Sequence, residues 1–380
     1  MSLAPLAGIK VLEFGHTILG PCCGMVLADL GAEVIKIEPP GGERTRRLKG
    51  FGTGYFGYFN RNKKSIELDY KTHAGLEVAR RLIAESDVLI ENMAPHALER
   101  AGLGENVARA INPNLIYCSL KGFLDGPYAN RVALDEIAQM MSGLAYMTGP
   151  PGRPLRAGTS ITDMLGGIFG ALGVLVALRE RDKGKGGALV ESALFETAAF
   201  LMGQYMAYSS LTGEKVPPMP ARVSAWAVYD LFQASDGRSV FVGITSNNHW
   251  DAFCREFSRP DLFADRSLAT NEQRVDARSR LMPELTRLFG ALPGREIERR
   301  CVKAGLPFAF VAHPEDLFED PHLNANGSLA ATTLPGGISS KVPLLPIRLD
   351  GKAFPLRDDP PLAGADTAEI LGAPDKESAP

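Results

Sequence analysis

One aspartate, Asp163, has the surroundings of a reactive carboxylate. It follows the small polar segment 158–162 and opens an apolar helix that the sequence predicts over residues 163–181. The start of a helix offers free amide donors and the positive end of the helix dipole, so we expect Asp163 to stay ionised. Such a carboxylate can attack an acyl group, and the resulting anhydride exchanges readily when the acceptor is another carboxylate. The alternative is that Asp163 only caps the helix.

The predicted helix after Asp163 contains four glycines, at positions 166, 167, 170 and 173. Glycines on a helix let another backbone or a bulky ligand approach closely. The longest apolar stretch, 164–178, is shorter than the roughly 20 residues that a membrane-spanning helix needs. We therefore interpret it as a buried helix and expect no membrane contact.

A histidine, His16, directly follows the first predicted strand, residues 9–14. Open α/β sheets bind ligands at this end of a strand, although a hydrogen-bonded loop histidine is the alternative. The glycines at 15, 20 and 24 do not form G-x-G-x-x-G, and Glu38, which ends the next predicted strand, is followed by two prolines. The dinucleotide-binding fingerprint is therefore missing, and a nicotinamide oxidoreductase stays only as an alternative.

Basic and acidic residues suggest further ligand contacts. Two basic clusters, 44–47 and 60–64, are solvated surface when taken alone; together with Lys71, Arg100 and Lys121 they favour a multiply anionic ligand such as a nucleotide. Asp135 and Glu136 begin another predicted helix and are interpreted as caps or orienting groups, with acid/base work as the alternative.

Other chemistries lack their residues. There is no G-x-S-x-G of a serine hydrolase, and the six histidines are scattered without metal-ligand spacing. Lys plus Arg number 41 against 44 Asp plus Glu, so the net charge of −3 gives no general reason to bind nucleic acid. Five cysteines without a C-x-x-C pair favour a reducing compartment, and the N-terminal segment does not resemble a signal peptide. The cytoplasm is the expected location.

Strands alternate with helices through the first half of the chain and predict a doubly wound α/β layer. The expected strands are 9–14, 33–38, 65–68, 88–91 and 115–120, and the expected helices are 21–30, 72–85, 134–147, 163–181 and 190–211. In the second half the expected strands are 227–232, 239–244, 330–333 and 345–349, and the expected helices are 248–257, 271–288, 296–304 and 367–371.

The domain organisation follows from a change in composition. Three prolines and a glycine within 212–222 break the periodicity and indicate a linker. We expect a large domain at 1–211, a linker at 212–226 and a small domain at 227–326. The last segment, 327–380, is expected to return to the large domain.

Several longer motifs follow one another along the first half of the chain. They are LxGIKVLEFxH, GPCCGMVLADLGAEVIKIEPPGG, FNRNKKSIELD, ENMAPHALERAGLG, NPNLIYCSLKGF, LDEIAQMMSG, ITDMLGG and ERDKGKGG, with VYDLFQASDG and LPFAFVAHPEDLFEDP in the second half. In this combination the chain resembles the family III coenzyme A transferases.

The resemblance implies a fold, a reaction and a site. Members transfer coenzyme A from an acyl-CoA to a free carboxylic acid through an aspartate that forms acyl anhydride and CoA thioester intermediates. They have an open Rossmann-like large domain built from both chain ends, a smaller inserted α+β domain and an interlocked homodimer. No metal and no tightly bound cofactor are implied, because CoA is a substrate. The aspartate falls on Asp163. The CoA contacts, to which we add Lys121, fall on His16, Thr17, Leu19, Leu68, Asn92, Met93 and Arg100.

Sister branches of the family narrow the expected reaction. The alpha-methylacyl-CoA racemases carry a histidine immediately before the aspartate that corresponds to Asp135, where this chain has Leu134. Without that base a transferase is favoured, and a 2-methylacyl-CoA epimerase or a non-catalytic acyl-CoA-binding protein remain alternatives. The glycine-run loop of the formyl-CoA:oxalate branch is replaced by residues 222–226. This replacement argues against oxalate. The ITDMLGG and VYDLFQASDG blocks resemble branches that act on succinate, glutarate or related dicarboxylates, which suggests succinyl-CoA as the donor. Asn247, Asn248 and His249 are candidates for choosing the acid.

Overall fold

The computed structural model describes residues 3–222 and 224–372 and forms two compact units. Unit 1 contains the chain up to Ala221 and again from Pro321, and unit 2 is Arg222–Asp320. Both boundaries lie a few residues before the expected ones, 227 and 326. At the second boundary this is because a short helix, α15 (Pro321–Ala325), belongs to unit 1.

Unit 1 is built on a six-stranded parallel sheet with the strand order β3-β2-β1-β4-β5-β6. Its strands are β1 (Lys10–Phe14), β2 (Glu33–Glu38), β3 (Lys63–Glu67), β4 (Val88–Glu91), β5 (Ile116–Lys121) and β6 (Ala188–Ala193). The predicted doubly wound α/β layer is thus confirmed. The order reverses between β1 and β4, and such sheets bind ligands at the carboxyl ends of the strands at this point.

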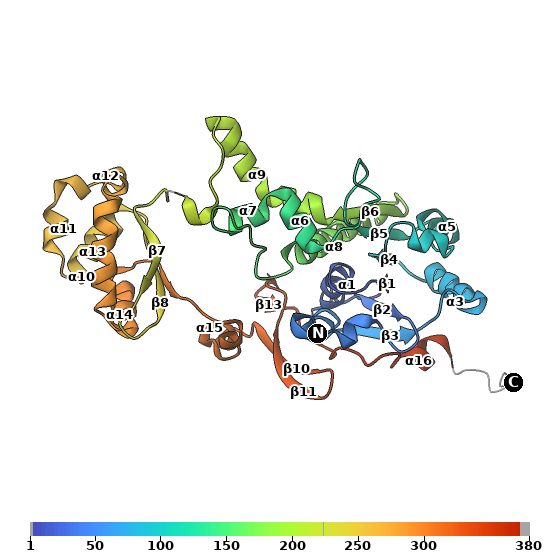
Figure 1. Cartoon of the computed structure of the whole chain (residues 1–380). Helices are drawn as coiled ribbons and strands as arrows, with labels where there is room; N and C mark the ends of the chain where they lie inside the picture. Colours follow the sequence, from blue (N-terminus) through green and yellow to red (C-terminus); the bar gives the residue numbers. More distant parts are fainter. Residues whose placement is uncertain (1–2, 223, 373–380) are drawn as a thin grey trace. The chain divides into compact units, whose positions relative to one another are not determined.

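Helices cover both faces of the sheet (Figure 1). The first face packs against α1 (Leu19–Asp29), α6 (Asp135–Ser142), α8 (Ile161–Arg181) and α9 (Leu194–Thr212). The second face packs against α3 (His73–Ala84), α5 (Glu105–Ile111) and α16 (Thr367–Leu371). Short helices complete the unit: α2 (Tyr55–Phe59), α4 (Ala97–Arg100) and α7 (Leu144–Thr148).

The glycines of α8 allow close packing against α1 and the sheet. A Cβ on Gly167 would lie 2.7 Å from the carbonyl oxygen of Leu19, which begins α1. On Gly170 it would lie 2.6 Å from Leu120 of β5. The glycines were expected to admit either another backbone or a bulky ligand. At Gly167 it is the protein's own backbone that approaches.

The return of the chain end covers the free edge of the sheet. The backbone N–H of Ser65 on β3 donates to Asp366 Oδ2 at 2.7 Å, and Asp366 N–H donates to Ser65 O at 2.9 Å. Glu67 N–H donates to Thr367 Oγ1 at 3.0 Å, and α16 lies beside β3 in Figure 1. Edge strands pair with other chains when left open, so this segment blocks that pairing.

Two expected helices of unit 1 are wrong in part. Residues 190–193 of the expected helix 190–211 belong to β6, because they pair with β5 in register, Cys118 opposite Val190. The expected helix 134–147 is interrupted at Gly143, whose φ of +88° is left-handed and ends α6. Both errors come from reading Ala- and Met-rich sequence as continuous helix.

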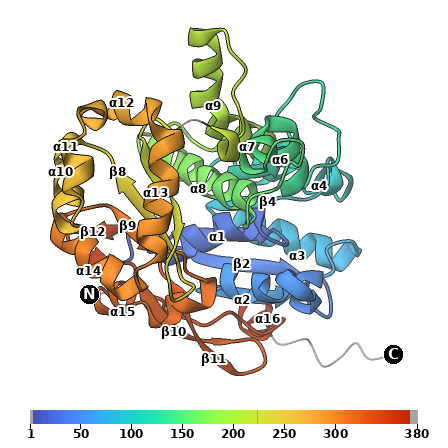
Figure 2. The ribbon, with the colours of Figure 1, turned by 60° about the vertical axis from the view of Figure 1, so that its left-hand side comes forward.

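Unit 2 and the remaining strands are antiparallel. Unit 2 has the sheet β7-β8-β9, made of β7 (Val228–Gln233), β8 (Ser239–Ile244) and β9 (Phe308–Phe310). Its helices are α10 (Asn247–Glu256), α11 (Pro260–Ala264), α12 (Asn271–Asp276), α13 (Arg278–Gly290) and α14 (Gly294–Ala304), and Figure 2 shows α10 and α13 beside β8. In unit 1, β10 (Leu329–Leu334) pairs with β11 (Ile338–Pro343), and β12 (Arg348–Leu349) with β13 (Lys352–Ala353). The sequence missed β9, β11 and β13.

Candidate active site

A cavity of about 580 Å³ lies in unit 1 at the carboxyl ends of β1, β4 and β5. The loop after each of these strands forms part of its wall, and the starts of α6 and α8 complete it. The structure therefore brings most of the predicted site residues to one place. These are His16, Thr17, Leu19, Asn92, Met93, Lys121 and Asp163.

Two predicted contacts do not line this cavity. Leu68 is buried in the apolar core on the other face of the sheet, where it packs in one cluster with Phe14. Arg100 is exposed at the end of α4, and its guanidinium donates to the carbonyl of Pro95 at 3.2 Å. Lys121 does line the cavity, but its ammonium is paired with Glu191.

Asp163 lies in the first turn of α8, as predicted, and is half-buried. No donor in residues 3–222 or 224–372 hydrogen-bonds to its carboxylate. Burial, together with the negative charge of Asp135 and against the opposing charge of Arg156, raises the pKa of Asp163 to about 7. The helix start therefore does not keep the pKa of Asp163 low, contrary to the expectation that it stays ionised.

The amide that Asp163 was expected to use is taken by Asp135. Asp135 is buried at the start of α6, and its Oδ1 accepts from the backbone N–H of Thr162 at 2.9 Å and from the Thr162 hydroxyl at 2.6 Å. Its Oδ2 accepts from Gln139 at 2.7 Å and Arg156 at 2.9 Å. Asp135 thus caps α8 from a neighbouring helix, which satisfies a free amide at the helix start.

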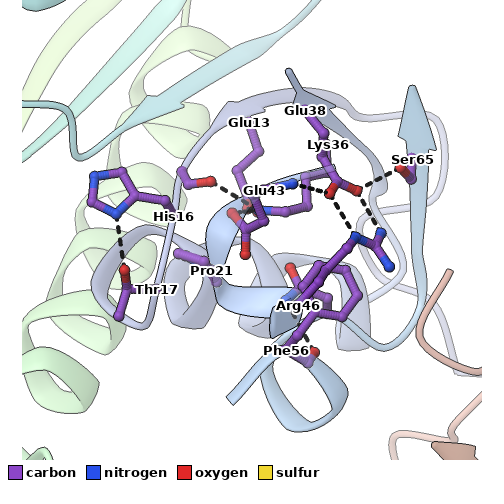
Figure 3. Close-up of polar contacts among 12 residues, drawn as sticks. Glu13, His16, Thr17, Pro21, Lys36, Glu38, Glu43, Arg46, Phe56 and Ser65 are labelled. Carbon is purple, nitrogen blue, oxygen red and sulfur yellow. Dashed lines mark hydrogen bonds and ion pairs between the residues drawn. The ribbon is translucent and has the colours of Figure 1, made fainter. Parts of the chain in front are cut away.

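The loops after β1 and β4 are tied together by Asn92. The backbone N–H of His16 donates to Asn92 Oδ1 at 2.9 Å, and Asn92 Nδ2 donates back to His16 O at 3.1 Å. A Cβ on Gly20 would lie 2.6 Å from Asn92 Oδ1, so glycine is required there. The His16 ring lies 2.9 Å from Thr17 Oγ1 (Figure 3), and desolvation lowers the pKa of His16. The imidazole is therefore mostly neutral at pH 7.

The two predicted basic clusters mostly form internal ion pairs. Arg61 pairs with Asp29 at 2.7 Å, and both side chains are buried. Lys63 pairs with the buried Glu13 and Arg46 with the buried Glu38, whereas Lys64 pairs with Glu369 at the surface. The expectation that these residues hold a phosphate is wrong for the buried members, because their charges are already compensated. Since Glu38 is held by Arg46, it is also unavailable for a ribose hydroxyl.

Sequence reasoning missed several residues of the cavity wall. Glu91 lines it at the end of β4, accepting from the Ser119 hydroxyl and from the N–H of Met93 at 2.8 Å. Burial raises the pKa of Glu91. Arg131 lines it too, with its guanidinium 4.9 Å from the ring centroid of Tyr128. Glu91 could have been found, since it ends a correctly predicted strand and precedes Asn92.

We searched the described residues for groups of side chains that could bind a metal ion. Among the described residues no group of three or more His, Cys, Asp or Glu side chains could hold a metal ion. The candidate reactive group of the cavity is therefore the Asp163 carboxylate at the start of α8. It lies beside the Asp135 carboxylate, both of whose oxygens accept hydrogen bonds.

Comparison with known proteins agrees with this arrangement. The model of CoA-transferase family III matches residues 6–367. The chain belongs to CoA-transferase family III. It is 32% identical over 383 residues to the succinyl-CoA–L-malate CoA-transferase alpha subunit of Chloroflexus aurantiacus, covering 97% of this chain and 88% of that one. It is also 32% identical to the succinyl-CoA:glutarate CoA-transferase of Mus musculus, covering 97% of this chain and 86% of that one.

A solved structure has the same fold. A CAIB/BAIF family protein from Brucella suis superimposes with a TM-score of 0.87 at 30% identity, over 97% of this chain and 99% of that one. The family III assignment from the sequence is thus confirmed. This family III member is an enzyme of the CoA-transferase type, and its substrates are CoA thioesters.

Proposed function

We propose that this chain transfers coenzyme A from an acyl-CoA donor to a free carboxylic acid, with Asp163 as the covalent nucleophile. The observation that carries the proposal is the state of the Asp163 carboxylate. It faces the cavity without a hydrogen bond from the described residues, and the carboxylate of Asp135 raises its pKa. A carboxylate that is neither paired nor hydrogen-bonded keeps its lone pairs for attack.

The proposed reaction balances with Asp163 alone as the protein nucleophile. An Asp163 oxygen attacks the thioester carbonyl, the C–S bond breaks, and CoA leaves as thiolate. The thiolate attacks the Asp163 carbonyl of this anhydride and releases the donor acid, which leaves an aspartyl-CoA thioester. The acceptor carboxylate attacks that thioester and expels the thiolate again. The thiolate then attacks the acceptor acyl carbon, which yields the new acyl-CoA and regenerates Asp163.

Asp135 supports this role by holding the start of α8. Its bonds to both donors of Thr162 fix the residue directly before Asp163 in the chain. Gln139 and Arg156 hold Asp135 in turn. Asp135 is thus proposed as a positioning residue, and Glu136, which is exposed and 3.6 Å from Arg156, as an outer partner.

We propose that the acyl-CoA lies along the loops after β1 and β4. The predicted contacts that line the cavity are the candidates for holding it: His16, Thr17, Leu19, Asn92, Met93 and Lys121. Arg100 could reach it only from the surface beside the cavity, and Leu68 only supports β1 from the core. The proposed donor is succinyl-CoA with a short dicarboxylic acid as acceptor, because both curated relatives are named for succinyl-CoA, one with L-malate and one with glutarate.

We also propose that the chain is a homodimer, interlocked as the resemblance implies. Among the described residues, α8 is long and apolar enough to cross a membrane, yet one side of it packs on α1. Its other side exposes Ile168, Leu172 and Val176, four residues apart, and α9 exposes Phe200. In both views α9 projects from unit 1 (Figures 1 and 2). A second copy would bury these apolar side chains, and light scattering of Leu172→Glu against the wild type measures this.

The decisive experiment traps the covalent intermediate. The purified protein is incubated with succinyl-CoA without an acceptor, then treated with hydroxylamine or borohydride, and the peptide that contains Asp163 is weighed by mass spectrometry. We expect a modification at Asp163 that is absent in Asp163→Ala. Glu136→Gln, which changes a nearby exposed carboxylate, should be labelled like the wild type.

An unlabelled Asp163 with several acyl-CoA donors would contradict the mechanism. If deuterium from heavy water then appears at the α-carbon of a 2-methylacyl-CoA, the epimerase alternative replaces it. A chain that binds CoA but catalyses neither reaction would be an acyl-CoA-binding protein.

A further inference from the structure

Beneath the loop that carries His16 lies a buried network of four charges, of which Figure 3 labels Glu13, Lys36 and Glu43. Glu13, at the end of β1, is fully buried, and each of its oxygens accepts from a different lysine. Oε1 accepts from Lys36 of β2 at 3.1 Å, and Oε2 accepts from Lys63 of β3 at 2.7 Å. Glu43 pairs with Lys36 at 3.1 Å and balances the charge. The network is therefore neutral as a whole.

The two lysines hold the two ends of the same loop. Lys36 Nζ donates to the carbonyl of Gly15 at 2.8 Å, directly before His16. Lys63 Nζ donates to the carbonyl of Pro21 at 2.9 Å, in the first turn of α1. Each ammonium has three donors, and each uses all of them, because Lys63 also bonds Asn60 at 3.0 Å. Residues 16–20 thus lie between two carbonyl groups, of Gly15 and Pro21, that the lysines hold by hydrogen bonds.

The loop needs such support because its backbone is strained. Thr17 has a φ of +65°, a left-handed conformation that residues with a side chain seldom adopt. Conformations of this kind cost about 1–3 kcal/mol and persist only where the surroundings enforce them. Asn92 holds the backbone of His16 from the cavity side, and the lysines hold it from below.

Two glycines whose spacing does not match a dinucleotide-binding fingerprint, Gly15 and Gly24, contact the same charge network. A Cβ on Gly24 would lie 1.9 Å from Glu13 Oε2, and one on Gly15 would lie 3.1 Å from Glu13 Oε1. A side chain at Gly24 would therefore collide with the Glu13 carboxylate between β1 and α1, and one at Gly15 would crowd it. The pattern at 15 and 24 makes room for a buried charge rather than for a phosphate.

We propose that Glu13, Lys36 and Lys63 are positioning residues, which fix the strained loop 16–19 in the shape that binds the CoA part of the substrate. None of the three lines the cavity, so they act through the carbonyls of Gly15 and Pro21. The inference rests on the proposed function for the identity of the ligand. The claim that the network holds the loop in place is independent of the proposed function.

The test compares two charge-balanced double variants. Lys36→Met/Glu43→Gln removes the clamp on Gly15 and one charge of each sign, while Glu13 keeps Lys63. The matched control Asp29→Asn/Arg61→Met removes an equally buried ion pair that does not touch residues 15–21. We expect the first variant to raise the Kd for CoA and the KM for succinyl-CoA about tenfold with kcat changed less than about threefold. The control should leave both constants near the wild-type values.

A milder substitution keeps the test open if the first variant does not fold. Glu13→Asp retains every charge, but its shorter carboxylate cannot reach both ammonium groups, and we expect the Kd for CoA to rise about threefold. Glu43→Gln alone keeps the bond from Lys36 to Gly15 and should bind CoA normally. An unchanged Kd in the folded clamp variants, or an equal loss in the Asp29/Arg61 control, would overturn the proposal.

Hydrogen exchange separates this proposal from the proposed function. The amides of residues 16–19 should exchange faster in Lys36→Met/Glu43→Gln than in the control, with no ligand present. If the wild type binds no CoA, the proposed function fails while the exchange rates still decide the role of the network. If the wild type binds CoA but the exchange rates are equal in both variants, the positioning role fails alone.

Discussion

Glu13 and Asp163 are two carboxylates of the same unit whose pKa values are shifted in opposite directions. Glu13 is fully buried, yet Lys63 and Lys36 outweigh the cost of burial and hold the pKa of Glu13 below its ordinary value. Asp163 is less buried, but burial and the neighbouring Asp135 raise its pKa to about 7. The depth of burial therefore does not decide the charge of a carboxylate here. The partners at hydrogen-bond distance do.

The difference separates a fully paired site from an unpaired one. At Glu13 every hydrogen bond of both lysines is satisfied, which makes the network rigid. At Asp163 the carboxylate that receives all the donors is its neighbour, Asp135. The proposed nucleophile Asp163 is thus left without hydrogen-bond donors at a cost in stability, whereas the charges at Glu13 are all paired.

The largest effect is expected on removing the paired carboxylate. Glu13→Gln leaves Lys36 and Lys63 buried without their shared partner and should lower the free energy of unfolding by about 3–5 kcal/mol in urea titrations near pH 7. The double variant Glu13→Gln/Lys63→Met removes one charge of each sign and should recover part of the loss. Because the pKa of Glu13 is lowered, its contribution is present above pH 4.5 and is lost as the pH falls below that value. A loss that does not shrink in acid would contradict this.

The unpaired carboxylate should behave in the opposite way. Its pKa is raised from 3.8 to about 7, so the wild type loses stability as the pH rises through this range. Asp163→Asn avoids the loss and should be more stable than the wild type at pH 8, by at most about 4 kcal/mol. At pH 3 the advantage should vanish. Thermal unfolding at both pH values measures it, Glu136→Gln serves as the control, and an equal Tm at pH 8 would refute the expectation.

Crowding the paired carboxylate gives a smaller effect. Gly24→Ala places a Cβ against Glu13 Oε2 and should cost about 2 kcal/mol of stability, because the carboxylate must leave its lysines. The control is Gly290→Ala in α13, where a Cβ would meet only Gln233 O at 3.7 Å. That substitution should be neutral or stabilise by about 0.5 kcal/mol through a better helix propensity. Equal unfolding midpoints for the two variants would show that Glu13 has room to move.

The smallest effect concerns the neighbour of the reactive group. Asp135→Asn removes the negative charge that raises the pKa of Asp163 and should move the acidic limb of kcat/KM about one pH unit lower. Since rates rise as Asp163 ionises, activity at pH 6 should fall less steeply than in the wild type. Glu136→Gln, which lies farther out, should leave the limb in place. A limb that does not move with Asp135→Asn would mean that another group titrates.

Much of the fold could be read from the sequence because its patterns are local. The strands 33–38 and 88–91 and the helix 367–371 coincide with β2, β4 and α16. β6 could not be read, since its residues take the strand conformation only by pairing with β5. The placement of Asp163 at the start of a helix was also right, because an apolar run preceded by small polar residues marks such a start.

The charge states of the site could not be read from the sequence. The clusters 44–47 and 60–64 looked like solvated or phosphate-binding cations, but Lys63 and Arg61 belong to buried pairs with partners far away in the chain. The same holds for the amide of Thr162, which Asp135 takes from a different helix. Sequence spacing identifies groups that can react, but it does not reveal which of them has a competing partner.

The sequence alone therefore determined the family, the parallel α/β sheet and the place of Asp163 at a helix start. Those features depend on local patterns and on motifs of fixed spacing. Only the tertiary structure decided that Asp163 is the unpaired carboxylate and Glu13 the paired one. The physical reason is that the pKa of a buried group depends on the few charges and donors within hydrogen-bond distance, and these come from strands and helices that meet only when the chain has folded.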